Sequence, residues 1–293
     1  QDQNSGFNPH PLYAKLNQDR HAKRFIFMPI ALSFLAIFAY ALASLIILFR
    51  LNAKRLNKSP SMSRKWPIIV SAIGIAFHLL TILNTTFTAT GVDFGLLSMM
   101  SVITWIIALL VWIICVTNPM EHLGIIALPL ASGILLIKML FTDTVLINYD
   151  ISLKLHITLS LMAYSLISLA AIQAILLGIQ NNHLHNQKPT GFIRILPPLK
   201  IMEKQLFQLL LIGFITLTLS LASGFIFLED MFAQHVAHKT ILSMVAWLGF
   251  AVLLWGHFQY GWRGKTATRW TLAGAIILML AYLGSKLVFE LRA

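Results

Sequence analysis

Residues 95–116 read GLLSMMSVITWIIALLVWIICV, a continuous apolar stretch without a charged side chain. A bilayer core of about 30 Å is crossed by a helix of roughly 20 apolar residues, which is the length of this stretch. Hydrocarbon accepts only helices or closed barrels, and the stretch is too long and continuous for a barrel strand. It therefore predicts a transmembrane helix.

Seven more stretches of this kind occur along the chain, separated by segments with turn or charge signals such as TNPME and GWRGKTAT. They predict an all-α fold, a polytopic membrane bundle of about eight transmembrane helices that forms a single domain over residues 28–293. The seven stretches are 29–49, 66–84, 123–141, 155–179, 206–228, 240–260 and 270–289.

The composition agrees with a membrane protein. Apolar residues make up 58% of the 293 residues and charged residues 11%, against about 45–50% and about 25% in soluble domains. The net charge of +12 does not indicate a nucleic-acid partner, because the chain lacks the water-facing basic surface that such a partner needs. The lipid bilayer is the expected partner. The single cysteine, Cys115, excludes an intramolecular disulfide framework and a cysteine-based metal motif.

The basic residues predict the orientation. Thirteen Lys and Arg residues lie on the connections and flanks after the odd-numbered stretches, and four lie after the even-numbered ones. The positive-inside rule therefore places the odd connections in the cytoplasm and both chain termini on the outer side.

Residues 1–27 do not fit this orientation, because this polar leader carries four basic residues and would have to cross the membrane. Two explanations are open. The leader is either a genuine, poorly ordered extension, or a readthrough upstream of a natural start at Met28, which directly precedes the first apolar stretch. We expect the second. No small-residue cleavage site follows a short apolar region, so the leader is not a secretory signal peptide.

Histidines inside apolar stretches are candidates for function, since ionisable groups are costly at bilayer depth. His78 lies in IGIAFHLLTIL, and His156 lies near the outer start of the fifth stretch, in LKLHITLSLMAYS. Neutral imidazole is a good axial ligand for heme iron, and heme between helices needs an apolar slot with histidine on one or two walls. The structural alternative is that each histidine hydrogen-bonds a Ser, a Thr or a carbonyl of a neighbouring helix.

The remaining histidines give weaker signals. His257 lies at the inner end of the seventh stretch among tryptophans and basic residues, as in any helix end at the interface. His235 and His238 are spaced like a metal-binding pair, with Glu229 and Asp230 nearby, but two ligands without a third are a weak metal site. Expected to be solvated loop residues are His122, His183 and His185. Lys138, near the outer end of the fourth stretch, is expected to snorkel.

No phosphate-binding loop, catalytic carboxylate pair or Ser-His-Asp set is present in the sequence, which excludes the usual hydrolases and NTPases. The absence of paired halves with broken helices also argues against a transporter core. An accessory subunit or modulator of an ion or metabolite transporter, with structural or metal-binding histidines, remains the alternative function.

Several stretches resemble the cytochrome c assembly family, which includes CcsA and HemX, in the right order and at matching intervals. They are MPIALSFLAIFAYALAS at residues 28–44, SAIGIAFHLL at 71–80, KLHITLSLMAYSLISLAA at 154–171, PPLKIMEKQLFQLLLIGFITLTLSLASGF at 197–225 and HKTILSMVAWLGFAVLLWGHFQYGWRGKTATRWTLAGAIILMLAYLGSKLV at 238–288. The resemblance begins at Met28, which supports a start there.

The resemblance implies heme binding in a bacterial inner membrane and a role in heme handling or cytochrome c biogenesis, with other biogenesis proteins as partners. It implies His78 and approximately His257 as the pair that holds heme within the membrane, and His156, followed by Tyr164, as an outer-surface ligand. The outer segment LEDMFAQHVAHKT retains Lys239 but lacks the tryptophans with which the CcsA branch presents heme. Heme retention, regulation or assembly is therefore favoured over enzymatic heme attachment.

Overall fold

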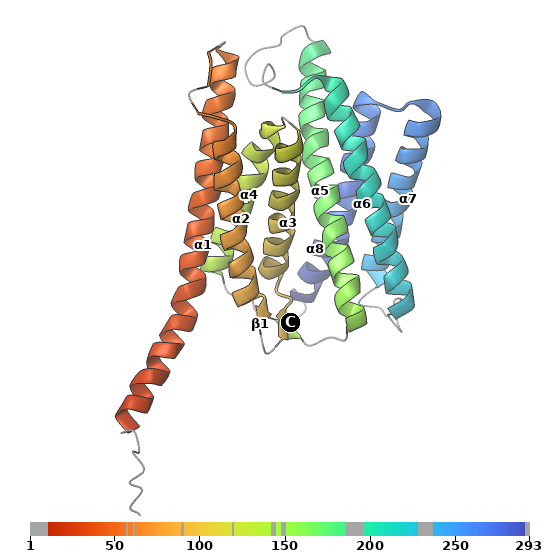
Figure 1. Ribbon diagram of the computed structural model, residues 1–293. Coiled ribbons are helices and arrows are strands. Elements are labelled where there is room, and N and C mark those ends of the chain that lie inside the picture. Colours follow the sequence, from red (N-terminus) through yellow and green to blue (C-terminus); the bar gives the residue numbers. More distant parts are fainter. Residues whose placement is uncertain are drawn as a thin grey trace, which may run out of the picture.

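The computed structural model describes residues 11–56, 58–60, 62–88, 91–118, 120–141, 145–147, 151–185, 196–227 and 237–290. Eight α-helices and one 3-10 turn, η1, account for most of this part of the chain (Figure 1). They are α1 (Pro11–Arg55), α2 (Lys65–Thr85), α3 (Leu96–Thr117), η1 (Glu121–Leu123), α4 (Gly124–Leu140), α5 (Ile151–His185), α6 (Leu199–Phe227), α7 (Ala237–Tyr260) and α8 (Gly264–Glu290).

The predicted all-α membrane bundle is confirmed. Among the described residues, seven helices, α1 to α7, are long and apolar enough to cross a membrane. The eighth predicted stretch also forms a helix, α8, with 27 residues. Successive helices run up and down the bundle, so that the connections alternate between its two ends (Figure 1).

Several helices extend beyond the apolar stretches that predict them. α6 begins at Leu199 and α8 at Gly264, seven and six residues before the predicted starts at 206 and 270. The added turns carry charged residues. These helices can continue past the hydrocarbon because water and headgroups in the interface solvate the charged side chains. α1 begins at Pro11, within the polar leader.

Three short strands form a small antiparallel sheet that the sequence did not predict. β1 (Phe87–Thr88) and β3 (Leu146–Ile147) pair with β2 (Gly91–Asp93), which lies between them. Asp93, the last residue of β2, is buried, and its carboxylate accepts hydrogen bonds from the backbone N–H groups of Gly95, at 2.9 Å, and Val145, at 2.8 Å. The hydroxyl of Ser98 donates a third. The sheet and this carboxylate join the connection after α2 to the one after α4.

The helices pack as two groups of four. α1 to α4 contact one another, as do α5 to α8, and the contact between the groups runs chiefly through α3 and α5. Figure 1 shows α1 and α2 at one side of the bundle and α6 and α7 at the other. The Ser165 hydroxyl on α5 donates across this junction to the Ile103 carbonyl on α3, at 3.3 Å.

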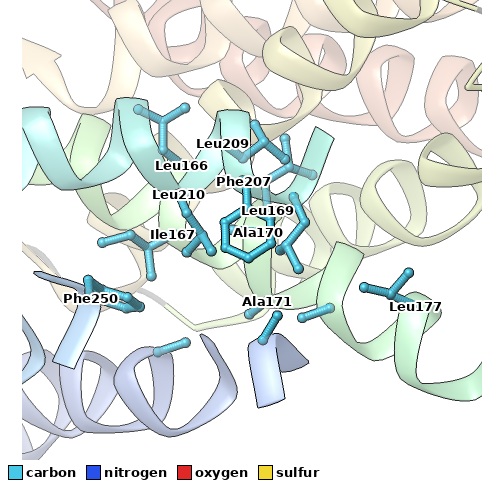
Figure 2. Packing of buried hydrophobic residues seen from close by; sticks show 14 of the residues in the cluster. Leu166, Ile167, Leu169, Ala170, Ala171, Leu177, Phe207, Leu209, Leu210 and Phe250 are labelled. Atoms are coloured by element: carbon cyan, nitrogen blue, oxygen red, sulfur yellow. The ribbon is translucent and has the colours of Figure 1, made fainter. Parts of the chain in front are cut away.

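Small residues allow the helices in the second group to approach closely. A Cβ added at Gly213 would lie 3.1 Å from the Ile167 side chain, and one added at Gly274 would lie 2.6 Å from the Phe250 ring. Figure 2 shows the resulting core, in which apolar side chains of α5 and α6 pack together beside Phe250 of α7. The labelled residues in this core include Leu166, Leu169, Ala170, Phe207, Leu209 and Leu210.

Candidate functional site

His78 is completely buried on α2, between α1 and α3. Its Nδ1 lies 3.2 Å from the Tyr40 hydroxyl oxygen, and its Nε2 lies 3.0 Å from the Ser101 hydroxyl oxygen. The Tyr40 ring meets the imidazole edge-on, with ring centroids 5.8 Å apart. Both ring nitrogens are therefore engaged, and the contact with Ser101 is of the kind that the structural alternative for this histidine predicts.

The hydroxyl partners leave the proton position of His78 open. A hydroxyl donates or accepts, so either nitrogen of His78 can carry the proton. Ligation of iron by this imidazole requires that the bond to Tyr40 or the one to Ser101 is given up. The assignment of His78 as a heme ligand stays a prediction.

His156 has a different environment, in the second turn of α5. Its Nδ1 lies 3.0 Å from the Ser220 carbonyl oxygen and 3.0 Å from the Ser223 hydroxyl oxygen, both on α6. A carbonyl only accepts, so Nδ1 carries the proton and Nε2 of the neutral imidazole carries the lone pair. No hydrogen bond engages Nε2 within the described part of the chain, and the side chain is half-buried.

Serine side chains surround His156 at this end of the α5–α6 interface. Ser160 donates to the His156 carbonyl at 2.8 Å, and its hydroxyl lies 2.7 Å from that of Ser220. Tyr164 lies on another face of α5, because eight residues correspond to about 80° of rotation beyond two full turns. The Tyr164 ring packs against Tyr282 of α8, with ring centroids 5.5 Å apart. Tyr164 and His156 therefore do not form one site.

His257 lies in the last turn of α7 and stacks on Phe207 of α6, with ring centroids 3.4 Å apart and an interplanar angle of 13°. Its Nδ1 donates to the Trp262 carbonyl at 2.9 Å, which again places the lone pair on Nε2. Gly261, with φ at 67°, and Gly264, with φ at 53°, form the turn that brings this carbonyl back to the helix end. A left-handed backbone of this kind favours glycine.

The three histidines lie at different levels of the bundle. His257 contacts α6 at Phe207 and His156 contacts it at Ser220, and thirteen residues of helix span about 20 Å. His78 bonds Ser101 on α3, and Ile103, two residues further along α3, accepts a hydrogen bond from Ser165 on α5. Ser165 lies nine residues beyond His156 on the same helix. His78 therefore lies about 10 Å further into the membrane than His156. No two of the three face each other across a common slot.

The weak metal site is not supported by the described residues. His235, Glu229 and Asp230 lie outside them, and His238 is exposed at the start of α7. Within the described ranges, no group of three or more His, Cys, Asp or Glu side chains is arranged to hold a metal ion. Lys138 donates to the hydroxyls of Thr85, at 2.9 Å, and Thr86, at 3.1 Å, which are contacts that the snorkelling prediction did not include.

The prediction that His122 is a solvated loop residue is wrong. His122 lies in η1 and is 2% exposed, because the short turn before α4 folds into the bundle instead of over its surface. Among the residues that the structure describes, neither His122 Nε2 nor Oε1 of the buried Gln173 on α5 has a geometric hydrogen-bond partner. Gln173, an isolated glutamine in the apolar stretch 155–179, is the sequence signal that could have indicated a buried polar group here. His183 is exposed, as predicted, although it lies within α5.

A cavity of about 20 Å³ lies beside Cys115, Glu121 and Ser71. It holds about one water molecule, whereas ligand pockets commonly have about 300–1,000 Å³. This cavity does not fit heme. His156 and His257 each offer a nitrogen of the kind that ligates heme iron. In each, a backbone carbonyl accepts Nδ1–H, which leaves the lone pair on Nε2.

Comparison with known proteins gives the family. Residues 66–291 match the family described as Cytochrome C assembly protein. The chain belongs to the cytochrome c assembly family. The inner membrane protein YpjD of Escherichia coli strain K12 is 31% identical over 236 residues, which cover 78% of this chain and 88% of YpjD.

Two further proteins are similar to this chain over shorter regions. The cytochrome c biogenesis protein CcsA of Prochlorococcus marinus strain MIT 9303 is 25% identical over 84 residues, or 28% of this chain and 26% of CcsA. An uncharacterized 28.8 kDa protein of Azospirillum brasilense is 32% identical over 140 residues, or 47% of this chain and 52% of that protein. No solved structure matches the chain.

Proposed function

We propose that this chain binds heme in a bacterial inner membrane and takes part in heme handling or cytochrome c biogenesis, with both termini on the outer side. Membership in the cytochrome c assembly family supports this role, and YpjD is named as an inner membrane protein. The single observation that carries the site is the bond between His156 Nδ1 and the Ser220 carbonyl. It leaves Nε2 as the nitrogen with the lone pair.

His156 is the proposed axial ligand on the outer half of the bundle. Histidines that ligate metals usually donate their other N–H to a carbonyl or carboxylate, which fixes the ring orientation and raises the basicity of the ligating nitrogen. The Ser220 carbonyl and the Ser223 hydroxyl are placed for this role. When bound, heme supplies an iron centre that accepts a neutral imidazole and can change its oxidation state.

His257 is the second proposed ligand, at the inner end of α7. Stacking on Phe207 and the bond to the Trp262 carbonyl hold its ring in place. His78 is proposed as a ligand only for a state in which the bond from Nε2 to Ser101, or that from Nδ1 to Tyr40, is released. The level difference between these histidines means that His156 and His257 serve separate positions along the bundle.

The test is the optical spectrum of the purified full-length chain in nanodiscs, titrated with hemin. We expect a saturable Soret band, and we expect His156→Ala to shift this band and weaken binding at least tenfold, the scale of losing a ligand or its support. His183→Ala is the matched control, because His183 is an exposed histidine on the same helix. Ser223→Ala should weaken binding less, since the Ser220 carbonyl still holds Nδ1.

Two results would contradict the proposal. A wild-type protein that takes up no hemin would exclude heme binding altogether. A His156→Ala variant with the spectrum and affinity of the wild type would leave heme binding intact but remove His156 as the ligand, and His257→Ala would then be the next variant to measure.

A further inference from the structure

The basic residues between the end of α1 and the start of α2 divide into two kinds. Arg50 and Arg64 form salt bridges with the buried Glu121, at 3.1 Å and 3.7 Å. The others are exposed and form no ion pair with an acid in the part of the chain that the structure describes. They are Lys54, Arg55, Lys58 and Lys65. This turn therefore carries positive charge that no described acid neutralises.

An exposed apolar stripe on α1 leads to one of these bases. Leu48 and Phe49 are exposed on this membrane-crossing helix, so they face lipid acyl chains. Arg55 and Leu56 follow them by seven residues, or about two turns, and therefore continue the same face of α1. Both are exposed. Lys54 lies about 100° around the helix from Arg55 and does not belong to this stripe.

A second stripe on α2 begins at a base. Trp66, Ile69 and Ile73 are exposed and spaced three and four residues apart, so they share one face of α2. Lys65, the first residue of α2, is four residues from Ile69 and lies above it on this face. Each of the two neighbouring helices thus presents lipid-facing apolar side chains with a base at the same end of the bundle.

Lys58 lies in the turn between the two stripes. Its backbone N–H donates to the Ala53 carbonyl at 2.9 Å, which folds the chain back at the end of α1. Arg50 donates to the Met62 carbonyl and holds the later part of the turn to α1. The turn is therefore fixed by backbone contacts, while the Lys58 side chain stays exposed.

We propose that Arg55, Lys58 and Lys65 bind the headgroup phosphate of an anionic phospholipid, whose acyl chains lie along the exposed stripes of α1 and α2. Clusters of Lys and Arg next to a transmembrane helix attract anionic headgroups. Trp66 fits this position, because tryptophan is enriched at the level of the headgroups. A soluble anion would account for the three bases but not for the apolar stripes that continue from them into the membrane.

The lipid site is separate from the proposed heme ligands. Lys65 and His78 both lie on α2, thirteen residues apart, which corresponds to about 20 Å along the helix. The site rests on the position of the bundle in a membrane and not on heme binding, so either proposal can fail without the other.

Quenching of Trp66 fluorescence by brominated lipid tests the site, because bromine quenches tryptophan at short range. The full-length protein is placed in nanodiscs of equal parts phosphatidylglycerol and phosphatidylcholine, with bromine on the acyl chains of one lipid or the other. The difference between the wild type and Trp66→Phe gives the Trp66 signal. We expect brominated phosphatidylglycerol to quench this signal about twofold more strongly, or better, than brominated phosphatidylcholine.

Substituting the three bases together, Arg55→Gln, Lys58→Gln and Lys65→Gln, should make the two brominated lipids equally effective. The matched control is the triple variant Lys200→Gln, Lys204→Gln and Lys265→Gln, which removes three exposed bases at the same end of the bundle. It should keep the preference for phosphatidylglycerol at Trp66.

Three results would overturn the proposal. The first is equal quenching by the two lipids in the wild type. The second is an equal loss of preference in both triple variants, because the effect would then come from overall charge. The third is loss of the preference in millimolar inorganic phosphate at constant ionic strength, which would identify a soluble anion as the ligand.

Discussion

Arg50 and Glu121, which lie 71 residues apart, form a buried ion pair with two hydrogen bonds, from Nε to Oε2 at 3.1 Å and from Nη2 to Oε1 at 3.2 Å. Arg50 also donates to the Met62 carbonyl, and Arg64 donates to the carbonyls of Cys115 and Asn118. Two of the basic residues that predict a cytoplasmic connection therefore also hold the ends of α1, α2 and α3 to η1.

Glu121→Gln should destabilise the protein strongly. The substitution removes the charge that neutralises Arg50, whose side chain is 7% exposed, and breaking a buried pair from one side costs about 3–5 kcal/mol. Chemical or thermal unfolding in nanodiscs measures the loss. Lys54→Gln is the control, because Lys54 is an exposed basic residue in the last turn of the same helix as Arg50. Equal stability of Glu121→Gln and the wild type would refute the pair's importance.

Gly74→Ala should disturb the Tyr40–His78 contact. An added Cβ would lie 2.8 Å from the Tyr40 ring, so the ring must move and α1 must separate from α2. We expect a loss of about 1–3 kcal/mol, the usual cost of overpacking, in the free energy of unfolding.

Gly133→Ala is the control for Gly74→Ala, since a Cβ on this α4 glycine meets nothing within 4 Å. It should be neutral or stabilise by about 0.5–1 kcal/mol, because alanine loses less backbone entropy in a helix. If Gly74→Ala and Gly133→Ala were equally stable, the close approach of α1 to α2 at Gly74 would not contribute to the stability of the protein.

Gly256→Ala should displace the turn that holds His257. The added Cβ would lie 2.4 Å from the Trp262 indole, and the Trp262 carbonyl is the acceptor of His257 Nδ1–H. We expect reduced stability and, if His257 ligates heme, a changed Soret band. Gly249→Ala, on the same helix two turns earlier, meets nothing within 4 Å and should retain both properties. A variant at Gly256 that behaves like the one at Gly249 would argue against this turn as the support of His257.

Cysteine labelling should reveal the proposed orientation. Cys115 is buried and free, so a Cys115→Ser background removes the only natural thiol. In intact spheroplasts, a membrane-impermeant maleimide should label Phe87→Cys on the outer side and leave Lys58→Cys unlabelled until the membrane is opened. Both positions are exposed. The reverse labelling pattern would invert the topology and place both termini in the cytoplasm.

The sequence predicted the helical bundle because twenty-residue apolar stretches leave few alternatives in hydrocarbon. It did not predict the three strands, since two- and three-residue segments such as Phe87–Thr88 form by pairing with distant parts of the chain. The predicted start of α6, at residue 206, lies after the observed start at Leu199 for a related reason. Apolarity marks the hydrocarbon boundary, whereas the helix itself ends where its backbone hydrogen bonds end.

The candidate histidines were found from their position in apolar stretches, but their environments required the fold. His78 and His156 look alike in sequence, and only the packing shows that one bonds two hydroxyls and the other a carbonyl. His122 lies between two apolar stretches, which predicts a solvated loop, and local sequence does not reveal that this turn folds into the bundle and buries the imidazole.

The ion pair between Arg50 and Glu121 also bears on the order of assembly. The ribosome synthesises Arg50 and Arg64 before Glu121 exists, so the first two helices enter the membrane with guanidinium groups that have no acid to meet. Only after residue 121 has been added can η1 draw α1, α2 and the end of α3 together. The acid at position 121 is thus the residue whose addition first allows the ends of the first three helices to be joined through Arg50 and Arg64.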